Sequence, residues 1–411
     1  MWNKNLGVKE GISTCAGLVV VGLILHLFTD GVDWRLLAWP VNLWLSITYY
    51  VGILILLYLL RTKLQFVRWA MSYKAAVPAL VTVVLLTVVM GLSVQVADYA
   101  NLSDVPALNR MLSSWPFVLA YVWMTSIVGL VSIKKLCHFR VGQIPSLLNH
   151  LGLFVALVAG VLGSADMERL TMNVRIGQPE WRAVDSHGRL YELPLAVELK
   201  NFSIDEYPPK LMLIDNATGN ALPVGNPEHL LLEDSVRTGQ LAGWNIEVAE
   251  VMETAAAVSA SDTVKYVEWP TTGATSAAYV KALSSDGAKV AEGWVSCGSF
   301  MFPYQALRLD SVSSLVMPER EPRRFASEVV IYTESGKIIE STVEVNSPVE
   351  VEGWKIYQYS YDEGKGRWSD VSVFELVTDP WLPVVYAGIV MMMLGAVCMF
   401  VLAQRNNKET I

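Results

Sequence analysis

Charged residues are scarce in this chain. Asp, Glu, Lys and Arg make up 17% of its 411 residues, hydrophobic residues make up 53%, and the mean hydropathy is +0.38. This composition is too apolar for an ordinary soluble protein, and the apolar residues gather toward both ends of the chain. The formal net charge is -8, which argues against the basic face that nucleic-acid-binding proteins use. The sequence therefore predicts an integral membrane protein with one large extramembrane domain.

Cysteine is also scarce, with four residues and no CxxC or CxxCH spacing. This excludes the usual sequence signatures of zinc binding, dithiol redox chemistry and c-type haem attachment. No Walker loop, GxGxxG or GxSxG motif is present either. Cys15, Cys137 and Cys398 lie in or beside apolar runs, so Cys297 is alone in the polar middle and no intrachain disulfide is expected. Free cysteine packs as a small hydrophobic residue, so we expect a buried strand residue at Cys297, with a reactive thiol as the alternative.

Six apolar runs are long enough, or nearly so, to cross ~30 Å of hydrocarbon as helices. Basic residues follow the second and fourth runs, whereas the segments after the first and third are acidic and poor in Lys and Arg. By the positive-inside rule, both termini are then cytoplasmic and residues 166–379 are extracytoplasmic. The runs cover approximately residues 13–29, 41–60, 75–96, 115–133, 144–164 and 381–402.

The polar middle of the chain has the pattern of β-strands. Segments rich in Val, Ile, Tyr and Trp alternate with Gly, Pro, Asn and Asp, and no helical periodicity runs through them. The segment from Glu328 to Val345 predicts a hairpin with Ser335 and Gly336 near its tip. Many short strands predict a large all-β extracytoplasmic domain of the sandwich or open-barrel kind.

Two histidines are expected within membrane helices, where ionisable side chains are costly and are functional candidates by default. His150 lies near the inner end of the fifth run, and His26 lies near the outer end of the first. Neutral imidazole is a common ligand of haem iron. The residues alone leave two interpretations of His150: a ligand, or a histidine hydrogen-bonded to a neighbouring helix. His26 is expected to snorkel toward the interface. His187 and His229, in polar turn-like contexts, are expected to be solvated.

Several segments, in the same order along the chain, resemble the ResB/CcsB-like cytochrome c biogenesis proteins of system II. The likeness covers about residues 70–405, and no single motif carries it. The segments are Ser72 to Gln95, the pair Ser114-Trp115, the run NHLGLFVALVAGVLGS from Asn149, Glu192 to Pro208, Val345 to Glu363, and TDPWLP around Asp379.

The resemblance implies a domain plan of three helices, a large extracytoplasmic domain and one closing helix. In this chain, residues 70–165 would form the three-helix core, residues 166–379 the β domain, and residues 380–411 the last helix with a short cytoplasmic tail. Residues 1–69 would add two helices that the family plan lacks. The role of these two helices, and of His26, does not follow from the resemblance.

The resemblance also implies a function. Such proteins work with a CcsA-type membrane partner, which carries a tryptophan-rich motif, to move haem b across the bacterial inner membrane and attach it to apocytochrome c. No tryptophan-rich segment of that kind is present here, so the chain is expected to be a non-autonomous subunit of a holocytochrome c synthase. In members of the family that are fused to the CcsA-type partner, a membrane histidine of the ResB-like half is one axial haem ligand and the partner half provides the other. The resemblance implies the first of these roles for His150, which occupies the matching position.

Four residues of the predicted β domain match the family pattern. Tyr357, Gln358, Tyr361 and Asp362 are candidates for partner binding, with core and turn residues of a strand pair as the alternative. For the whole chain, the alternative function is a non-catalytic membrane-anchored scaffold whose outer β domain docks partner proteins. A small-solute transporter is disfavoured because the helices lack polar residues, broken pairs and inverted symmetry.

Overall fold

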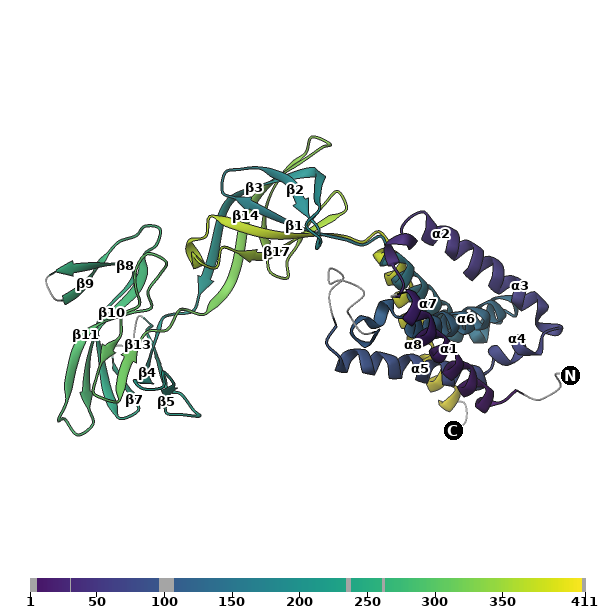
Figure 1. Cartoon of the computed structure of the whole chain (residues 1–411), viewed down its shortest axis with the longest axis horizontal. Coiled ribbons are helices and arrows are strands. Elements are labelled where there is room, and N and C mark those ends of the chain that lie inside the picture. Colours follow the sequence, from purple (N-terminus) through teal and green to yellow (C-terminus); the bar gives the residue numbers. More distant parts are fainter. Residues whose placement is uncertain (1–5, 30, 96–106, 234–237, 261–262, 409–411) are drawn as a thin grey trace. The chain divides into compact units, whose positions relative to one another are not determined.

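The computed structural model describes residues 6–29, 31–95, 107–233, 238–260 and 263–408. The chain forms two compact units (Figure 1). One unit is helical and contains Met1–Arg169 together with Val377–Ile411. The other contains Leu170–Leu376 and is built from β-strands; it is called the β domain below. The fold class predicted from the sequence, six membrane-spanning helices and a large all-β domain, is confirmed.

The helical unit has, among its described residues, six helices long and apolar enough to cross a membrane. The second span is one continuous helix whose hydrogen bonding changes at its centre. The α-helical segments α2 (Val41–Leu45) and α3 (Leu54–Leu59) flank an eight-residue π-helical segment, Ser46–Ile53. A short helix, α4 (Gln65–Ala70), connects the second and third spans. The other spans are α1 (Val8–Thr29), α5 (Tyr73–Leu92), α6 (Trp115–Cys137), α7 (Ile144–Gly163) and α8 (Leu382–Lys408).

Glycines allow the helices to approach closely. A Cβ atom added at Gly152 of α7 would lie 2.5 Å from the carbonyl oxygen of Gly388 in α8, and one added at Gly22 of α1 would lie 2.5 Å from the backbone of Pro116 in α6. Small residues at such crossings let two backbones touch, which is how helices associate in lipid. The first helix is therefore packed against the core helices.

The second span is also attached to the core helices, through hydroxyl groups. The hydroxyl groups of Tyr50 and Thr125 are 3.1 Å apart, and those of Tyr49 and Ser126 are 3.0 Å apart. Thr125 and Ser126 belong to α6 and are buried. Such pairs satisfy polar groups that would be costly in hydrocarbon. The two additional N-terminal helices are thus integral to the bundle.

The β domain contains an eight-stranded antiparallel sheet in the order β15-β14-β3-β2-β1-β18-β17-β16. Strand β15, at one edge of this sheet, contacts β16 and β17 at the other, so the sheet curls into an open barrel around its own apolar core. Its strands are β1 (Glu168–Arg175), β2 (Glu180–Val184), β3 (Leu190–Glu206), β14 (Pro322–Thr333), β15 (Ile338–Glu344), β16 (Val349–Val351), β17 (Trp354–Tyr361) and β18 (Val371–Thr378).

Two five-stranded sheets form the rest of the β domain. One has the order β11-β10-β8-β7 with β9 paired to β8, and the other has the order β12-β13-β4-β5 with β6 paired to β4. They share one core, in which Leu213 and Leu315 of one sheet pack with Ile246 and Val280 of the other, so this part is a sandwich. The strands are β4 (Lys210–Asp215), β5 (Ala221–Leu222), β6 (His229–Leu231), β7 (Thr238–Leu241), β8 (Trp244–Ala260), β9 (Thr263–Glu268), β10 (Thr275–Ser284), β11 (Val290–Ser296), β12 (Leu307–Arg308) and β13 (Ser313–Val316).

The predicted hairpin is present as β14 and β15, which pair from Ala326–Glu344 to Tyr332–Ile338. Gly336 lies in its turn with φ +82°, a backbone conformation that glycine adopts without steric cost. The local sequence signal and the tertiary structure therefore agree at this turn.

Candidate functional site

His150 lies in the second turn of α7, about 9 Å along the helix axis from Ile144 at 1.5 Å per residue. Its Nδ1 atom is 2.7 Å from the carbonyl oxygen of Ser146, one turn earlier in the same helix. A carbonyl oxygen only accepts, so Nδ1 carries a proton, and in the neutral imidazole the lone pair is then on Nε2. A backbone carbonyl on one ring nitrogen is the usual arrangement for a histidine that binds a metal through the other.

The ring of His150 projects from the face of α7 that meets α6. Ser146, one turn before it, accepts a 2.8 Å hydrogen bond from the Lys135 ammonium of α6, and Phe154, one turn after it, packs against Gly129 of the same helix. Residues four apart share a helix face. Another face of α7, which includes Asn149 and Gly152, packs against α8. The imidazole is half-buried, and its hydrogen bond is to its own helix, in contrast to the alternative of a bond to a neighbouring helix.

His26 has a different environment. Its Nδ1 atom is buried and has no hydrogen-bond partner among the described residues. This nitrogen does not reach water, so a snorkelling side chain would have to reach the interface through Nε2. The side chain lies next to Gly31, where an added Cβ atom would be 3.4 Å from its Cε1 atom. No further histidine joins it there in the described part of the chain, and the structure assigns it no ligand.

Asp166, just beyond the end of α7, joins three segments of the helical unit. Its carboxylate accepts hydrogen bonds of 2.6 Å from the Trp39 amide, 2.7 Å from the Asn42 side chain and 2.6 Å from the Trp381 indole. Asn42 is fully buried and also donates to the Leu162 carbonyl. Burial opposes ionisation of Asp166, but the three donors outweigh it and lower the pKa of this carboxyl below its ordinary value. Sequence reasoning gave no role to this residue beyond marking the start of the β domain.

The four predicted partner-binding residues lie on β17 and in the turn after it. Gln358 is 7% exposed, and its side-chain oxygen accepts hydrogen bonds from Ser327 at 2.5 Å and Ser372 at 2.9 Å inside the barrel. Tyr361 stacks on Phe202 with ring centroids 5.2 Å apart. These contacts are structural, and a partner-binding role for these residues stays a prediction.

The remaining two of the four residues are more accessible. Tyr357 is half-buried on β17, and Asp362 is half-buried in the turn after the strand. The Asp362 carboxylate accepts a hydrogen bond from the Gly364 amide at 3.1 Å, which stabilises that turn. The same turn carries Arg367 and Trp368, which sequence reasoning did not select.

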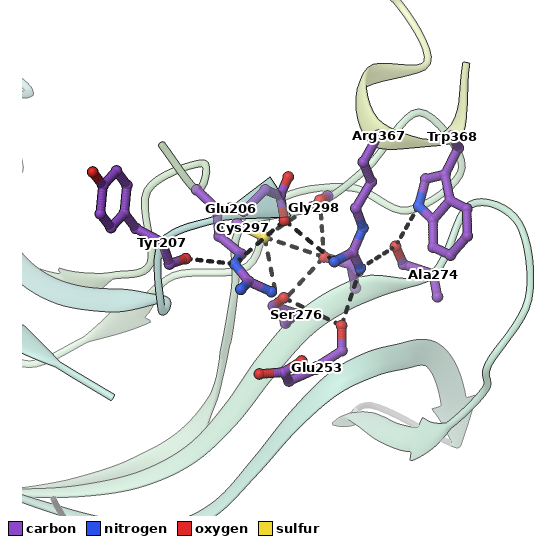
Figure 2. A network of polar contacts seen from close by, with 11 residues as sticks. Glu206, Tyr207, Glu253, Ala274, Ser276, Cys297, Gly298, Arg367 and Trp368 are labelled. Carbon is purple, nitrogen blue, oxygen red and sulfur yellow. Dashed lines mark hydrogen bonds and ion pairs between the residues drawn. The ribbon is translucent and has the colours of Figure 1, made fainter. Parts of the chain in front are cut away.

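A cluster of charged side chains in the β domain was also missed by sequence reasoning (Figure 2). The Glu206 carboxylate, at the end of β3, lies 3.3 Å from both Arg320 and Arg367. Arg367 also donates to the carbonyl oxygens of Glu253 and Ala274, so it links the barrel to the sandwich. Burial raises the pKa of the Glu206 carboxyl, and the two guanidinium groups limit that rise. No motif joins these residues, which come together only through the fold.

Cys297 lies in the same cluster, and its predicted environment is corrected. It follows the last residue of β11 and is half-buried, so it is not a fully buried strand residue. Its thiol is 3.7 Å from the Ser276 carbonyl (Figure 2). It is also 3.5 Å from the Thr275 hydroxyl. The strand ends here because Gly298 turns the chain with φ +73°. The thiol lines a cavity of about 390 Å³, together with Arg320 and Arg367.

Comparison with known protein families gives a match that includes part of this cluster. Residues 270–371 match the model of the ResB-like family. The matched segment is about a quarter of the chain, and it contains Cys297, Arg320 and Arg367. No curated protein sequence matches the chain. The ResB-like resemblance seen in the sequence is confirmed for this segment, and at the level of the family it supports a role in cytochrome c biogenesis.

Proposed function

We propose that this ResB-like protein is the membrane subunit of a cytochrome c haem-delivery and attachment complex of the system II kind. It acts with a CcsA-type partner in the bacterial inner membrane, takes haem b as transported substrate, and presents it to apocytochrome c. The match of residues 270–371 to the ResB-like family carries this proposal. The β domain is extracytoplasmic in this arrangement, and both termini are cytoplasmic.

His150 is the residue that we assign to haem. The Ser146 carbonyl accepts the hydrogen bond of the Nδ1–H group, so the neutral imidazole would offer its Nε2 lone pair to iron. The ring lies on the α6-facing side of α7, near the end of the helix that we place at the cytoplasmic side, where haem is made. An axial ligand from each subunit would make haem binding dependent on assembly of the complex.

The test is a visible spectrum of the chain co-purified with its CcsA-type partner. A Soret band is expected from the wild-type complex, and His150→Ala should weaken or shift it. His187→Ala is the matched control, because His187 is exposed in a turn of the β domain and should leave the spectrum unchanged. A stable complex that never carries haem would overturn the proposal and favour the membrane-anchored scaffold.

A further inference from the structure

The cavity beside Cys297 has an unbalanced charge on its buried wall. Arg320 and Arg367 share a single carboxylate, that of Glu206, so the wall carries one excess positive charge. The side chains are largely buried, with 10% of Arg320, 21% of Arg367 and 14% of Glu206 exposed. A cation held away from water with less than one counter-charge is costly, and an incoming anion would relieve that cost.

Arg320 also has unused hydrogen-bond donors. Its Nε atom donates to the Tyr207 carbonyl at 2.9 Å and lies beside Glu206. Its two terminal nitrogens form no hydrogen bond to the described part of the protein, and the side chain lines the cavity. A guanidinium presents its terminal donors as a planar fork that matches the two oxygens of a carboxylate. Arg320 can therefore donate hydrogen bonds from both terminal nitrogens to a ligand in this cavity.

The other walls favour an organic ligand over a bare inorganic anion. Phe300, Phe302, Tyr304 and Trp368 line the same cavity. Trp368 is held in place by a 3.0 Å hydrogen bond from its indole to the Ala274 carbonyl. Aromatic walls with a few fixed polar groups are typical of sites for small organic ligands and side chains. The carboxylates at the rim, Glu319 and Glu363, are exposed and thus screened by solvent.

We propose that Arg320 and Arg367 form a carboxylate-binding subsite in the β domain. Its volume of about 390 Å³ fits a carboxylate with a short apolar stem. Two sources would supply such a group: a propionate of haem, or an acidic side chain of a protein client. The subsite is independent of the haem role proposed for His150, because no residue of the helical unit lines it.

The thiol of Cys297 serves as a reporter, because it lines the same cavity. The full chain in detergent is alkylated with N-ethylmaleimide, a neutral reagent, and modification of Cys297 is followed by peptide mass spectrometry. Acetate is compared with chloride at equal ionic strength, which controls for screening. A ligand at twice its Kd leaves about one third of the sites free, so roughly threefold slower alkylation is expected in acetate.

Substitutions of Arg320 test whether this residue causes the protection of Cys297 by acetate. Arg320→Gln should remove the protection by acetate, and Arg320→Lys, which keeps the charge but not the planar fork, should weaken it. Arg323→Gln is the matched control, because Arg323 is a nearby exposed arginine and its loss should leave the protection unchanged. Equal alkylation rates in acetate and chloride for the wild-type chain would overturn the subsite, as would equal protection in Arg320→Gln.

The source of the carboxylate is distinguished with two ligand pairs. Haemin is compared with haemin dimethyl ester, and an acetyl-Ala-Glu-Ala amide peptide with its Gln counterpart. Protection by haemin but not by its ester assigns the subsite to a propionate; protection by the acidic peptide alone assigns it to a client. Protection that persists in His150→Ala separates this subsite from the proposed haem ligand in the helices.

Discussion

Asp166 and Trp381 are joined by a 2.6 Å hydrogen bond from the indole nitrogen to the carboxylate, although 215 positions separate them in the chain. Asp166 follows the helix that leads into the β domain, and Trp381 precedes the helix that leads out of it. The same carboxylate accepts from the Trp39 amide, in the turn before α2, and from the Asn42 side chain of α2. One side chain thus fixes α2, α7 and α8 together at one end of the bundle.

Removing this carboxylate should destabilise the bundle. Asp166→Ala leaves three donors without their acceptor, and we expect a loss of about 1–3 kcal/mol at neutral pH, measured by thermal unfolding in detergent. The pKa of Asp166 is lowered in the folded state, so its contribution is present above the ordinary pKa of 3.8 and is lost as the pH falls through the folded-state value.

The control for Asp166→Ala is Asp33→Ala. The Asp33 carboxylate is exposed and accepts a hydrogen bond from the backbone amide of nearby Arg35. The unfolding temperature of Asp33→Ala should stay close to that of the wild-type chain. The difference in unfolding temperature between the wild-type and Asp166→Ala proteins should become smaller below about pH 4. If this temperature difference is the same at pH 7 and in acid, the charge of the Asp166 carboxylate does not account for its stabilising effect.

Packing of α7 against α8 should depend on Gly152. An added methyl group would meet the Gly388 carbonyl oxygen at 2.5 Å, so Gly152→Ala is expected to destabilise the folded protein by about 1–3 kcal/mol through overpacking. Gly160, on the same helix, has no atom among the described residues within 4 Å of such a methyl group. Gly160→Ala should therefore leave the unfolding temperature unchanged or raise it, and equal effects of the two substitutions would contradict the close approach.

Gln358 should matter for stability of the barrel. Its side-chain oxygen accepts from Ser327 and Ser372 in the core. Gln358→Leu removes that acceptor, and we expect a loss of about 1–3 kcal/mol, measured by urea unfolding. Tyr359→Phe is the control, because Tyr359 is 65% exposed. Unchanged stability with lost cytochrome c maturation would instead indicate the partner-binding role predicted from the sequence.

Cys297 is expected to be dispensable for cytochrome c maturation. Cys297→Ser keeps a small side chain able to donate to the Ser276 carbonyl, so the fold and the cavity should be preserved. Maturation is measured by haem staining of the client cytochrome, with the level of the variant protein followed by immunoblot. Lost maturation at a normal protein level would mean that the thiol takes part in the chemistry.

Local sequence determined much of this fold. In lipid every backbone polar group must be hydrogen-bonded within the protein, and a helix does so within a single segment. A long apolar run such as Val41–Thr62 therefore predicts a helix from its own sequence. Alternation and a turn glycine likewise determined the β14–β15 hairpin at Gly336. The histidine in NHLGLF could be selected from the sequence because an ionisable group in an apolar run is conspicuous. The hydrogen bond from its Nδ1 to the Ser146 carbonyl is also local, because the two residues are one helical turn apart.

The tertiary structure decided everything that joins distant segments. Glu206, Cys297, Arg320 and Arg367 come from four separate segments, and each is an ordinary polar residue in its local sequence. For Gln358 the sequence left two alternatives, a partner-binding residue and a core residue of a strand pair, and its burial depends on how the sheet curls. Local propensity specifies elements, whereas these contacts depend on how the sheets curl and how the helices cross. The sequence alone therefore determined the spans and the strands and made one histidine a candidate, and only the fold brought the three donors to the Asp166 carboxylate and formed the arginine cavity.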